Sequence, residues 1–285
     1  MNGLEIMWNA SEFIALVALG SVLAGFLGAL TGLGGGVVIV PLLTIAFGVD
    51  IRYAIGAALV SVIATSSGAA AAYVREGYSN VRVGMFLEIA TTIGALSGAS
   101  IAVYLRPSAI AVVFGMVLLY SAYLAYRQKE HATGEVAPDR MAARLRLDGS
   151  YPTKEGTTSY RVRNVPGGFS LMFVAGVLSG LLGIGSGAVK VLAMDQVMKL
   201  PFKVSTTTSN FMIGVTAAAS AGIYLSRGYI DPGIAMPVML GVLGGSLLGA
   251  RMLPAVRVEA LRLVFAIVIA ALAVEMIFSG VTGRI

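Results

Sequence analysis

The chain has 285 residues, of which 57% are hydrophobic and only 12% are charged, and its formal net charge is +6. Because a soluble domain carries about 25% charged residues, this composition excludes an ordinary soluble protein and predicts an integral membrane protein. The chain has no cysteine, which excludes disulfides and thiol chemistry, and its one histidine, His131, lies in the most polar segment, so we expect no metal site, no cofactor and no nucleic-acid partner.

Hydrophobic segments of about 20 residues recur along the chain without the alternation of barrel strands, so we predict an all-α integral membrane protein. In chain order the hydrophobic segments cover about 11–30, a short piece at 37–47, 54–74, 82–105 and 109–126, and then about 168–182, a short piece at 188–198, 204–225, 232–253 and 258–279. The intervening segment holds eight Lys or Arg and five Asp or Glu residues. The sequence thus predicts an N-terminal transmembrane repeat (1–126), a solvated cytoplasmic polar linker (127–167) and a C-terminal transmembrane repeat (168–285).

The two sets of segments share a motif at a constant spacing. Residues 24–40 read AGFLGALTGLGGGVVIV, and residues 175–191 read AGVLSGLLGIGSGAVKV. An ungapped match over several separated blocks predicts two structural repeats. The same offset of 151 joins Gly25 to Gly176, Gly32 to Gly183, Gly34 to Gly185, Gly36 to Gly187, Tyr73 to Tyr224 and Gly94 to Gly245.

The distribution of positive charge predicts that the second repeat is inverted. If each repeat crosses the bilayer an odd number of times and the linker lies inside, 15 Lys or Arg residues lie inside and 4 lie outside. Parallel repeats would give 12 inside and 7 outside. The positive-inside rule therefore favours two inverted repeats, each made of a Gly-broken helical hairpin and three transmembrane helices.

Each repeat is broken after its first hydrophobic segment, at TGLGGGVVIVP (31–41) and at LLGIGSGAVKV (181–191). Glycine inside a helix costs about 0.5–1 kcal/mol and proline about 3, so a plain membrane anchor would not carry this pattern. Inverted repeats with interrupted helices are typical of secondary transporters, whose substrate site lies near the bilayer midplane.

A helix that restarts after a break directs unpaired N–H groups and partial positive charge toward the break, and glycine lets an anion approach the backbone closely. We therefore expect an anion site formed by six residues of the two breaks: Gly34, Gly35, Gly36, Gly185, Ser186 and Gly187. The alternative is that these glycines only permit close helix packing, which we expect for pairs such as Gly241-x-x-x-Gly245.

Lys190 adds a full positive charge next to the second break, where the matching residue of the first repeat is Ile39. Ionisable residues within a membrane are candidates for function, so we expect Lys190 to bind the anion. The alternatives are that Lys190 extends to the membrane interface or pairs with a distant carboxylate. Glu88 is a candidate for carrying a coupling proton, and the alternative is an interfacial carboxylate.

The third hydrophobic segment of each repeat is rich in side chains that can donate hydrogen bonds to an anion without a fixed charge. Asn210 is the strongest candidate, because its matching residue, Leu59, is apolar. The alternative for the whole group is hydrogen bonding within and between helices. The candidates are Thr65, Ser66, Ser67, Thr207, Thr208 and Asn210.

The pattern G-x-x-x-x-x-x-G-[LI]-G-[GS]-G near the start of each half, with TSS at 65–67 and TTTSN at 206–210, resembles the sulfite exporter TauE/SafE family of bacterial membrane transporters. The resemblance spans nearly the whole chain outside 127–167. It implies export or uptake of small sulfur-containing anions, such as sulfite or organosulfonates including sulfoacetate, across the bacterial plasma membrane. Ser186 and Lys190 make the second half-site chemically different from the first.

We therefore predict a secondary active transporter that works by alternating access around the two broken helices. Its expected partners are a small anionic substrate and the lipid bilayer, and a homodimer stays an open alternative. A passive anion channel, or a transporter of another small organic anion, is the competing hypothesis. An enzyme is disfavoured, because the hydrophobic segments offer no histidine, cysteine or convincing catalytic pair.

Overall fold

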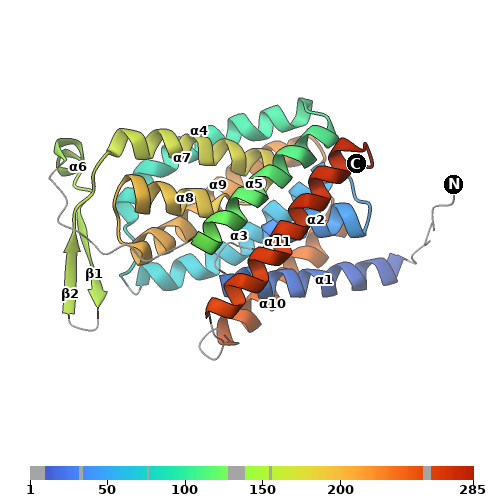
Figure 1. Cartoon of the computed structure of the whole chain (residues 1–285), viewed down its shortest axis with the longest axis horizontal. Helices are drawn as coiled ribbons and strands as arrows, with labels where there is room; N and C mark the ends of the chain where they lie inside the picture. Colours follow the sequence, from blue (N-terminus) through green and yellow to red (C-terminus); the bar gives the residue numbers. More distant parts are fainter. Residues whose placement is uncertain (1–9, 32–34, 76, 128–138, 154–155, 253–257) are drawn as a thin grey trace.

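The computed structural model describes residues 10–31, 35–75, 77–127, 139–153, 156–252 and 258–285. The described residues are mostly helical, and Figure 1 shows the long helices packed side by side with a small hairpin at the end opposite the C-terminus. The first set of elements comprises α1 (Ala10–Thr31), α2 (Gly36–Pro41), the π-helical turn η1 (Leu42–Ala46), α3 (Ile51–Arg75), α4 (Val81–Tyr104) and α5 (Pro107–Arg127). The linker holds α6 (Arg140–Arg144), β1 (Gly149–Thr153) and β2 (Gly156–Tyr160). The second set comprises α7 (Val165–Leu182), α8 (Gly187–Leu192), the π-helical turn η2 (Ala193–Val197), α9 (Phe202–Ser226), α10 (Pro232–Met252) and α11 (Val258–Val281).

Element bounds recur at the spacing found in the sequence. Adding 151 to the bounds of α2 gives those of α8, and the same shift turns η1 into η2 and α3 into α9. The same shift turns the first residue of α4, Val81, into that of α10, Pro232, and the first residue of α5, Pro107, into that of α11, Val258. The two halves of the chain therefore build the same series of elements.

The two halves exchange one helix each. α1 packs along α10 and α7 packs along α4, while α10 also contacts α3 and α4 contacts α9. We call α1, α2, α3 and α10 the first bundle, and α4, α7, α8 and α9 the second bundle. The bundles meet along α3 and α9, and α5 packs on α11. The segments 1–126 and 168–285 are thus interlocked rather than packed as separate units.

Glycines set the close approach of these helix pairs. A Cβ on Gly25 would collide with the Val242 carbonyl of α10, and a Cβ on Gly176 would collide with the Thr91 carbonyl of α4. Both contacts are related by the 151-residue offset. Gly241 and Gly245 pack against the α1 backbone in the same way. The expectation of close packing at the Gly241-x-x-x-Gly245 pair is confirmed, in keeping with the role of small residues between membrane helices.

Matching helices α3 and α9 start at opposite ends of the molecule. Asn80, which follows α3, donates its backbone N–H to the hydroxyl of Thr208 near the start of α9 at 3.0 Å. Arg52, near the start of α3, places its guanidinium 5.6 Å from the ring centre of Tyr229, which follows α9. The two helices therefore run in opposite directions across the interface between the bundles.

The linker, which the sequence predicts to be a solvated polar segment, contains regular secondary structure. Residues 139–162 include α6 and an antiparallel hairpin in which Gly149 pairs with Tyr160 and Thr153 with Gly156. Leu147 and Val162 are buried in one hydrophobic cluster with membrane-helix residues such as Val83. The all-α prediction therefore needs one correction: the linker contributes a two-stranded sheet, because apolar side chains spaced among its charges dock on the start of α4.

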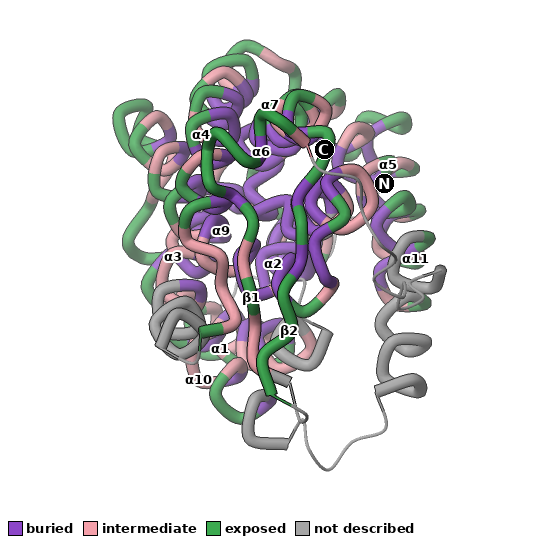
Figure 2. The backbone as a smooth tube through the Cα atoms, turned by 90° about the vertical axis from the view of Figure 1, so that its left-hand side faces the viewer, coloured by how far each residue is buried: buried purple, intermediate pink, exposed green. Residues whose placement is uncertain are grey.

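Three helices among the described residues are long and apolar enough to cross a bilayer: Val81–Tyr104, Val165–Leu182 and the Pro232–Gly249 part of α10. Figure 2 shows buried residues in the interior of the bundle and exposed ones along its outer sides. Large apolar side chains such as Leu23, Ile89 and Leu240 are exposed on these outer sides. Such faces are expected of helices that contact lipid, because the hydrocarbon core is the solvent there.

Candidate functional site

A hydrogen-bonded chain of three side chains joins two opposite charges inside the second bundle. Lys190 of α8 is fully buried, and its ammonium donates to the Thr216 hydroxyl of α9 at 2.6 Å. The Thr216 oxygen lies 2.7 Å from the Glu88 Oε1 atom of α4, to which the hydroxyl donates. Thr216 is fully buried and Glu88 is 8% exposed. We call Lys190, Thr216 and Glu88 the charged triad.

The Thr216 hydroxyl is a switchable link in this triad. An ammonium can only donate, so the Thr216 oxygen accepts from Lys190 and has a single proton left to give. Two acceptors lie within reach of that proton: Glu88 Oε1 and the Met212 backbone carbonyl, which is 2.9 Å away. Thr216 can therefore bond to Glu88 or turn to its own helix without moving its backbone.

Two buried polar atoms, one in the triad and one in the turn that precedes Lys190, have no hydrogen-bond partner among the described residues. They are Glu88 Oε2 and the hydroxyl of Ser186, and Thr216 is the one described partner of the Lys190 ammonium, which has three donor hydrogens. A buried polar group without a partner costs about 1–3 kcal/mol, so most are paired in folded proteins. These free donors and acceptors make the triad a candidate site for a polar ligand.

The second break leads directly into the triad. Gly183 and Gly185 adopt a φ of 69°, and Ser186 adopts a φ of 44°, which is uncommon for a residue with a side chain. The chain then enters α8, where the Lys190 N–H donates to the Ser186 carbonyl at 3.1 Å. The Ser209 hydroxyl of α9 donates to the Gly187 carbonyl at 3.4 Å. The break is thus an ordered turn that ends one helical turn before Lys190.

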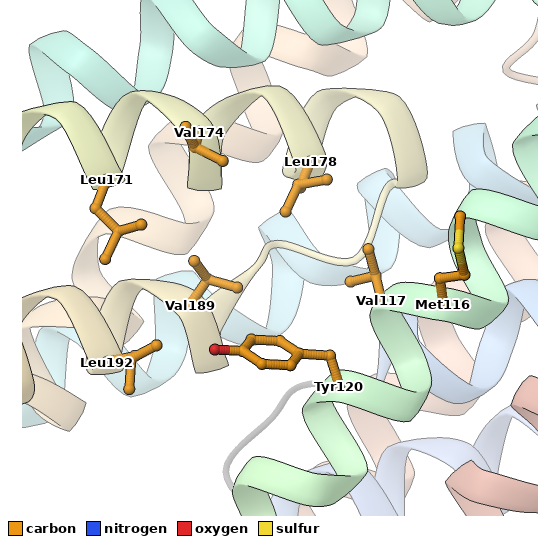
Figure 3. Close-up of a pocket in the computed structure, with 8 residues that line it drawn as sticks. All are labelled: Met116, Val117, Tyr120, Leu171, Val174, Leu178, Val189 and Leu192. Atoms are coloured by element: carbon orange, nitrogen blue, oxygen red, sulfur yellow. The ribbon is translucent and has the colours of Figure 1, made fainter.

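A groove elsewhere among the described residues is apolar and is not this site. It has a volume of about 270 Å³ and lies between α5, α7 and α8, as Figure 3 shows. Apolar side chains line it, among them Leu178, Val189 and Leu192. An anion would lose its hydration there without gaining a charged partner, so we do not assign the groove to the anion.

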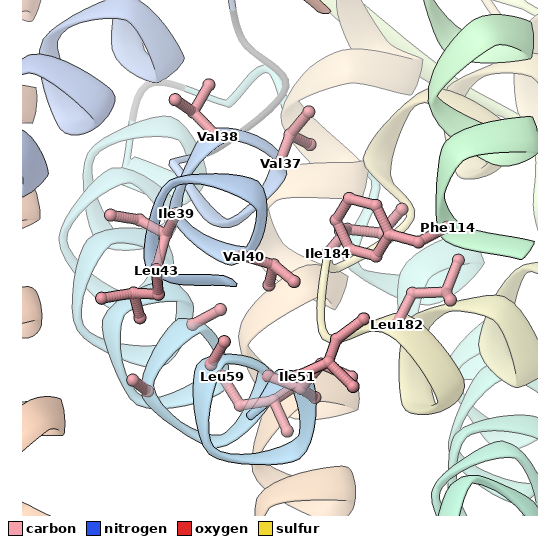
Figure 4. Packing of buried hydrophobic residues seen from close by; sticks show 14 of the residues in the cluster. Val37, Val38, Ile39, Val40, Leu43, Ile51, Leu59, Phe114, Leu182 and Ile184 are labelled. Atoms are coloured by element: carbon pink, nitrogen blue, oxygen red, sulfur yellow. The ribbon is translucent and has the colours of Figure 1, made fainter. Parts of the chain in front are cut away.

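The first break contacts the second break in the middle of the molecule. Gly35 caps α2 and accepts backbone hydrogen bonds from Val38 and Ile39 at 3.1 Å each. A Cβ on Gly36 would lie 3.1 Å from the Gly183 carbonyl of the second break. Figure 4 shows Val37 and Val40 of α2 on the side that faces Ile184, in one buried cluster. Gly34 lies outside the described residues.

The first bundle holds no charged triad at the matching positions. Ile39 stands where Lys190 stands in the second bundle, and Met239 stands where Glu88 stands. Thr65 matches Thr216, but its hydroxyl donates back to its own helix, at 3.0 Å from the Ser61 carbonyl. The two half-sites therefore have similar backbones and different charges.

The remaining predicted hydroxyl residues are occupied by structural contacts in this conformation. Ser66 bonds to the Ile63 carbonyl of its own helix at 3.2 Å. Thr207 bonds to the Tyr78 carbonyl at 3.0 Å, and Thr208 accepts the bond from Asn80 described above. The side chain of Ser67 lies outside the described residues. Thr207 and Thr208 thus hold the loop between α3 and α4 against α9.

The Asn210 amide is half-buried and has no hydrogen-bond partner in the described part of the chain.

Thr216 is the residue of the triad that the sequence analysis did not select. Its signal was weak, because a hydroxyl in a membrane helix usually bonds to its own backbone. Only the folded structure brings Thr216 between Lys190 and Glu88, because Thr216 and Glu88 are 128 positions apart in the chain.

Comparisons with known proteins identify the family. The family model described as sulfite exporter TauE/SafE matches residues 17–276. The chain is 28% identical over 278 residues to the probable membrane transporter protein YunE of Bacillus subtilis (strain 168), covering 95% of this chain and 99% of the relative. It is 26% identical over 239 residues to the probable membrane transporter protein YdhB of the same organism, covering 84% and 88%.

A probable membrane transporter protein of Xylella fastidiosa (strain 9a5c) is 26% identical over 269 residues, covering 92% of this chain and 95% of the relative. No solved structure matches the chain. The family match covers nearly all of the chain and confirms the resemblance seen in the glycine motifs. The chain is a multi-pass membrane protein that belongs to the sulfite exporter TauE/SafE family, and it is a transporter rather than an enzyme.

Proposed function

We propose that the protein is a secondary active transporter of small sulfur-containing anions, such as sulfite or organosulfonates including sulfoacetate, in the bacterial plasma membrane. The observation that carries the proposal is the fully buried Lys190, which follows the second break and has one hydrogen-bond partner among the described residues. Burying an ammonium is costly unless it is paired, and replacing a buried ion pair by apolar residues is often neutral or stabilising. A role in binding a ligand therefore explains the buried Lys190 charge better than a role in stabilising the fold.

The anion would bind where the two breaks meet, with its negative charge on the Lys190 ammonium. The Ser186 hydroxyl of the second break, which has no partner among the described residues, and the half-buried Asn210 amide of α9 are further candidate donors. Gly185 adopts a φ of 69°, and a Cβ there would lie 2.9 Å from the Ile213 Cγ2 atom, so glycine keeps this part of the break close to α9. The contact between Gly36 and Gly183 supports a single shared site rather than one site in each repeat.

We propose that the repeats are inverted in the membrane and that the linker is cytoplasmic. The opposite directions of α3 and α9 support this orientation. The linker hairpin lies at the same end as Arg82 and Lys203, while the other end holds Arg52, Arg106, Arg227 and Arg284. Positive charge is concentrated at the hairpin end, which the positive-inside rule assigns to the cytoplasm. Alternating access would then follow from movement of the bundles along the α3–α9 interface.

Binding to the purified protein tests the proposal. A ligand at about 100 times its Kd raises the apparent stability by about 2.7 kcal/mol, so thermal unfolding in sulfite, thiosulfate, sulfoacetate, sulfate and taurine reveals which anion binds. We expect sulfite or a sulfonate to raise the midpoint in the wild type and to have no effect on Lys190→Gln.

Lys203→Gln is the matched control, because Lys203 is exposed and its ammonium lies 3.9 Å from the Tyr78 ring centre, outside the triad. This variant should bind the anion as the wild type does. Equal stabilisation of Lys190→Gln and the wild type would remove Lys190 from the site. Stabilisation by taurine or by uncharged sulfur compounds alone would contradict an anion transporter.

A further inference from the structure

We propose that the anion and one proton occupy the charged triad together, so that transport is proton-coupled, with Glu88 as the proton site. The inference rests on the proposed function, because it concerns the same anion site. In the absence of substrate, the Glu88 carboxylate neutralises Lys190 through Thr216. When an anion binds to Lys190, Glu88 takes a proton from water on the side of entry, and both leave together on the other side.

Charge balance inside the second bundle requires that a proton bind together with the anion. Lys190 and Glu88 are both buried, and Thr216 links them by hydrogen bonds of 2.6 and 2.7 Å, so the empty triad has no net charge. Adding an anion alone would leave one uncompensated negative charge in a water-poor interior, which is strongly unfavourable. Protonation of Glu88 restores neutrality without any movement of the helices.

The hydrogen-bonding groups of the triad suit the binding of an anion together with a proton. Glu88 Oε2 is buried and has no partner in the described part of the structure, so it offers an unoccupied position for the proton. A protonated carboxyl group then donates a hydrogen bond, which an oxygen of the bound anion can accept. Thr216 can turn from Glu88 to the Met212 carbonyl at 2.9 Å, which releases Glu88 from its bond to the triad.

Among the described residues that pack around Glu88, no other charged group competes for this role. Helix α7 has no ionisable side chain, and on α9 the ionisable side chains are Lys203 and Tyr224, near its two ends. On α4 itself, Arg82 is exposed and lies near the linker, with a nitrogen 3.5 Å from the Arg146 carbonyl. Thr92 donates to Glu88 Oε1 at 3.3 Å but carries no charge.

The difference between the bundles sets the number of protons. Met239 matches Glu88 and Ile39 matches Lys190, so the first bundle has neither the ammonium nor the carboxylate. One anion and one proton per cycle is therefore the stoichiometry that the structure supports. For a monovalent anion this exchange carries no net charge, so a pH gradient of one unit should support an anion gradient of about tenfold.

The test is a flux assay in proteoliposomes that enclose a pH-sensitive dye. Labelled methanesulfonate is the main probe, because it stays monoanionic across the working pH range, and labelled sulfite is the second. With an interior one pH unit more alkaline than the outside, we expect the wild type to accumulate methanesulfonate about tenfold and to acidify the interior. Glu88→Gln should still exchange labelled for unlabelled anion but should lose accumulation and acidification.

Glu275→Gln is the matched control, since Glu275 lies in α11 and accepts its hydrogen bond from Ser279 on the same helix. It should behave as the wild type does. Thr216→Ser should keep the proton coupling, whereas Thr216→Val should shift the pH profile of exchange, which a merely structural role would not do.

The wild type alone decides the question if Glu88→Gln does not fold. Anion uptake by the wild type without acidification would overturn the inference, as would coupled accumulation by Glu88→Gln. If neither methanesulfonate nor sulfite moves in any assay, the proposed function fails instead, so the two failures are distinguishable.

Discussion

Replacing Lys190 by isoleucine should destabilise the protein, and replacing Glu88 by methionine in the same molecule should restore most of the loss. The two substitutions give the second bundle the residues that the first bundle has at the matching positions, Ile39 and Met239. Removing one partner of a buried ion pair strands the other charge, whereas removing both is often neutral or stabilising. Stability and anion binding should therefore separate in these variants.

The magnitude follows from the geometry of the triad. The two charges lie no more than 5.3 Å apart, because the hydrogen bonds through Thr216 measure 2.6 and 2.7 Å. At an effective dielectric constant of about 20, that separation corresponds to about 3 kcal/mol. Each kcal/mol shifts the midpoint of a domain of this size class by about 2–4 °C, so Lys190→Ile should melt about 6–12 °C below the wild type.

Thermal unfolding of the two single variants, the double variant and the Glu275→Gln control in one detergent measures the coupling between the two charges. The double variant should melt within a few degrees of the wild type, while anion binding is lost in every variant that lacks Lys190. Equal midpoints for Lys190→Ile and the double variant would refute an energetic link between the two side chains. Retained anion binding in the double variant would refute the assignment of the site.

Three further predictions concern the scaffold. Gly180→Val should force α7 away from α4 and lower the free energy of unfolding by more than about 2 kcal/mol, because a Cβ at this position collides with the Ala95 carbonyl. Gly222→Ala is the control and should not destabilise the protein, because a Cβ there meets nothing within 4 Å. Thermal unfolding compares the two variants. Asn80→Ala should cost about 1–2 kcal/mol and expose the linker hairpin to limited proteolysis, because Asn80 caps α4 and bonds to Leu147 and Tyr160. A hydrogen bond from the backbone N–H of Met141 holds the pKa of Asp139 below its usual value of 3.8. The carboxylate therefore stabilises α6 above pH 3.8, and this contribution is lost as the pH falls through the lowered pKa. Hydrogen exchange in α6 should rise over that pH range in the wild type and not in Asp139→Asn.

Much of the architecture was predictable from periodicity and repetition. The 151-residue offset predicted that the elements of the first half recur in the second, and α8, η2 and α9 do repeat α2, η1 and α3 at that spacing, because similar spacing of glycines and apolar residues builds similar local structure. The exchange of α4 and α10 between the bundles was not predictable, since it depends on which helix surfaces meet. In the structure, Gly176 and Gly180 of α7 pack against the α4 backbone, but their sequence pattern does not name that partner.

The candidate site was only partly predictable for the same reason. Lys190 and Glu88 were selected separately, as ionisable residues in apolar segments, and nothing local links residues on α8 and α4. Their connection depends on a hydroxyl of α9 that any sequence pattern would assign to helix packing. The hairpin of the linker was not predicted, because the charges of this segment dominate its sequence pattern, although Leu147 and Val162 are buried with residues of α4.

Counterflow in proteoliposomes tests the central claim most directly. Vesicles loaded with unlabelled sulfite or methanesulfonate are diluted into a trace of the labelled anion, and a carrier then concentrates the label transiently inside. The account predicts this transient overshoot for the wild type and for Lys203→Gln, and its absence for Lys190→Gln. Label that only equilibrates in the wild type, or an undiminished overshoot in Lys190→Gln, would contradict a carrier that works through the buried lysine.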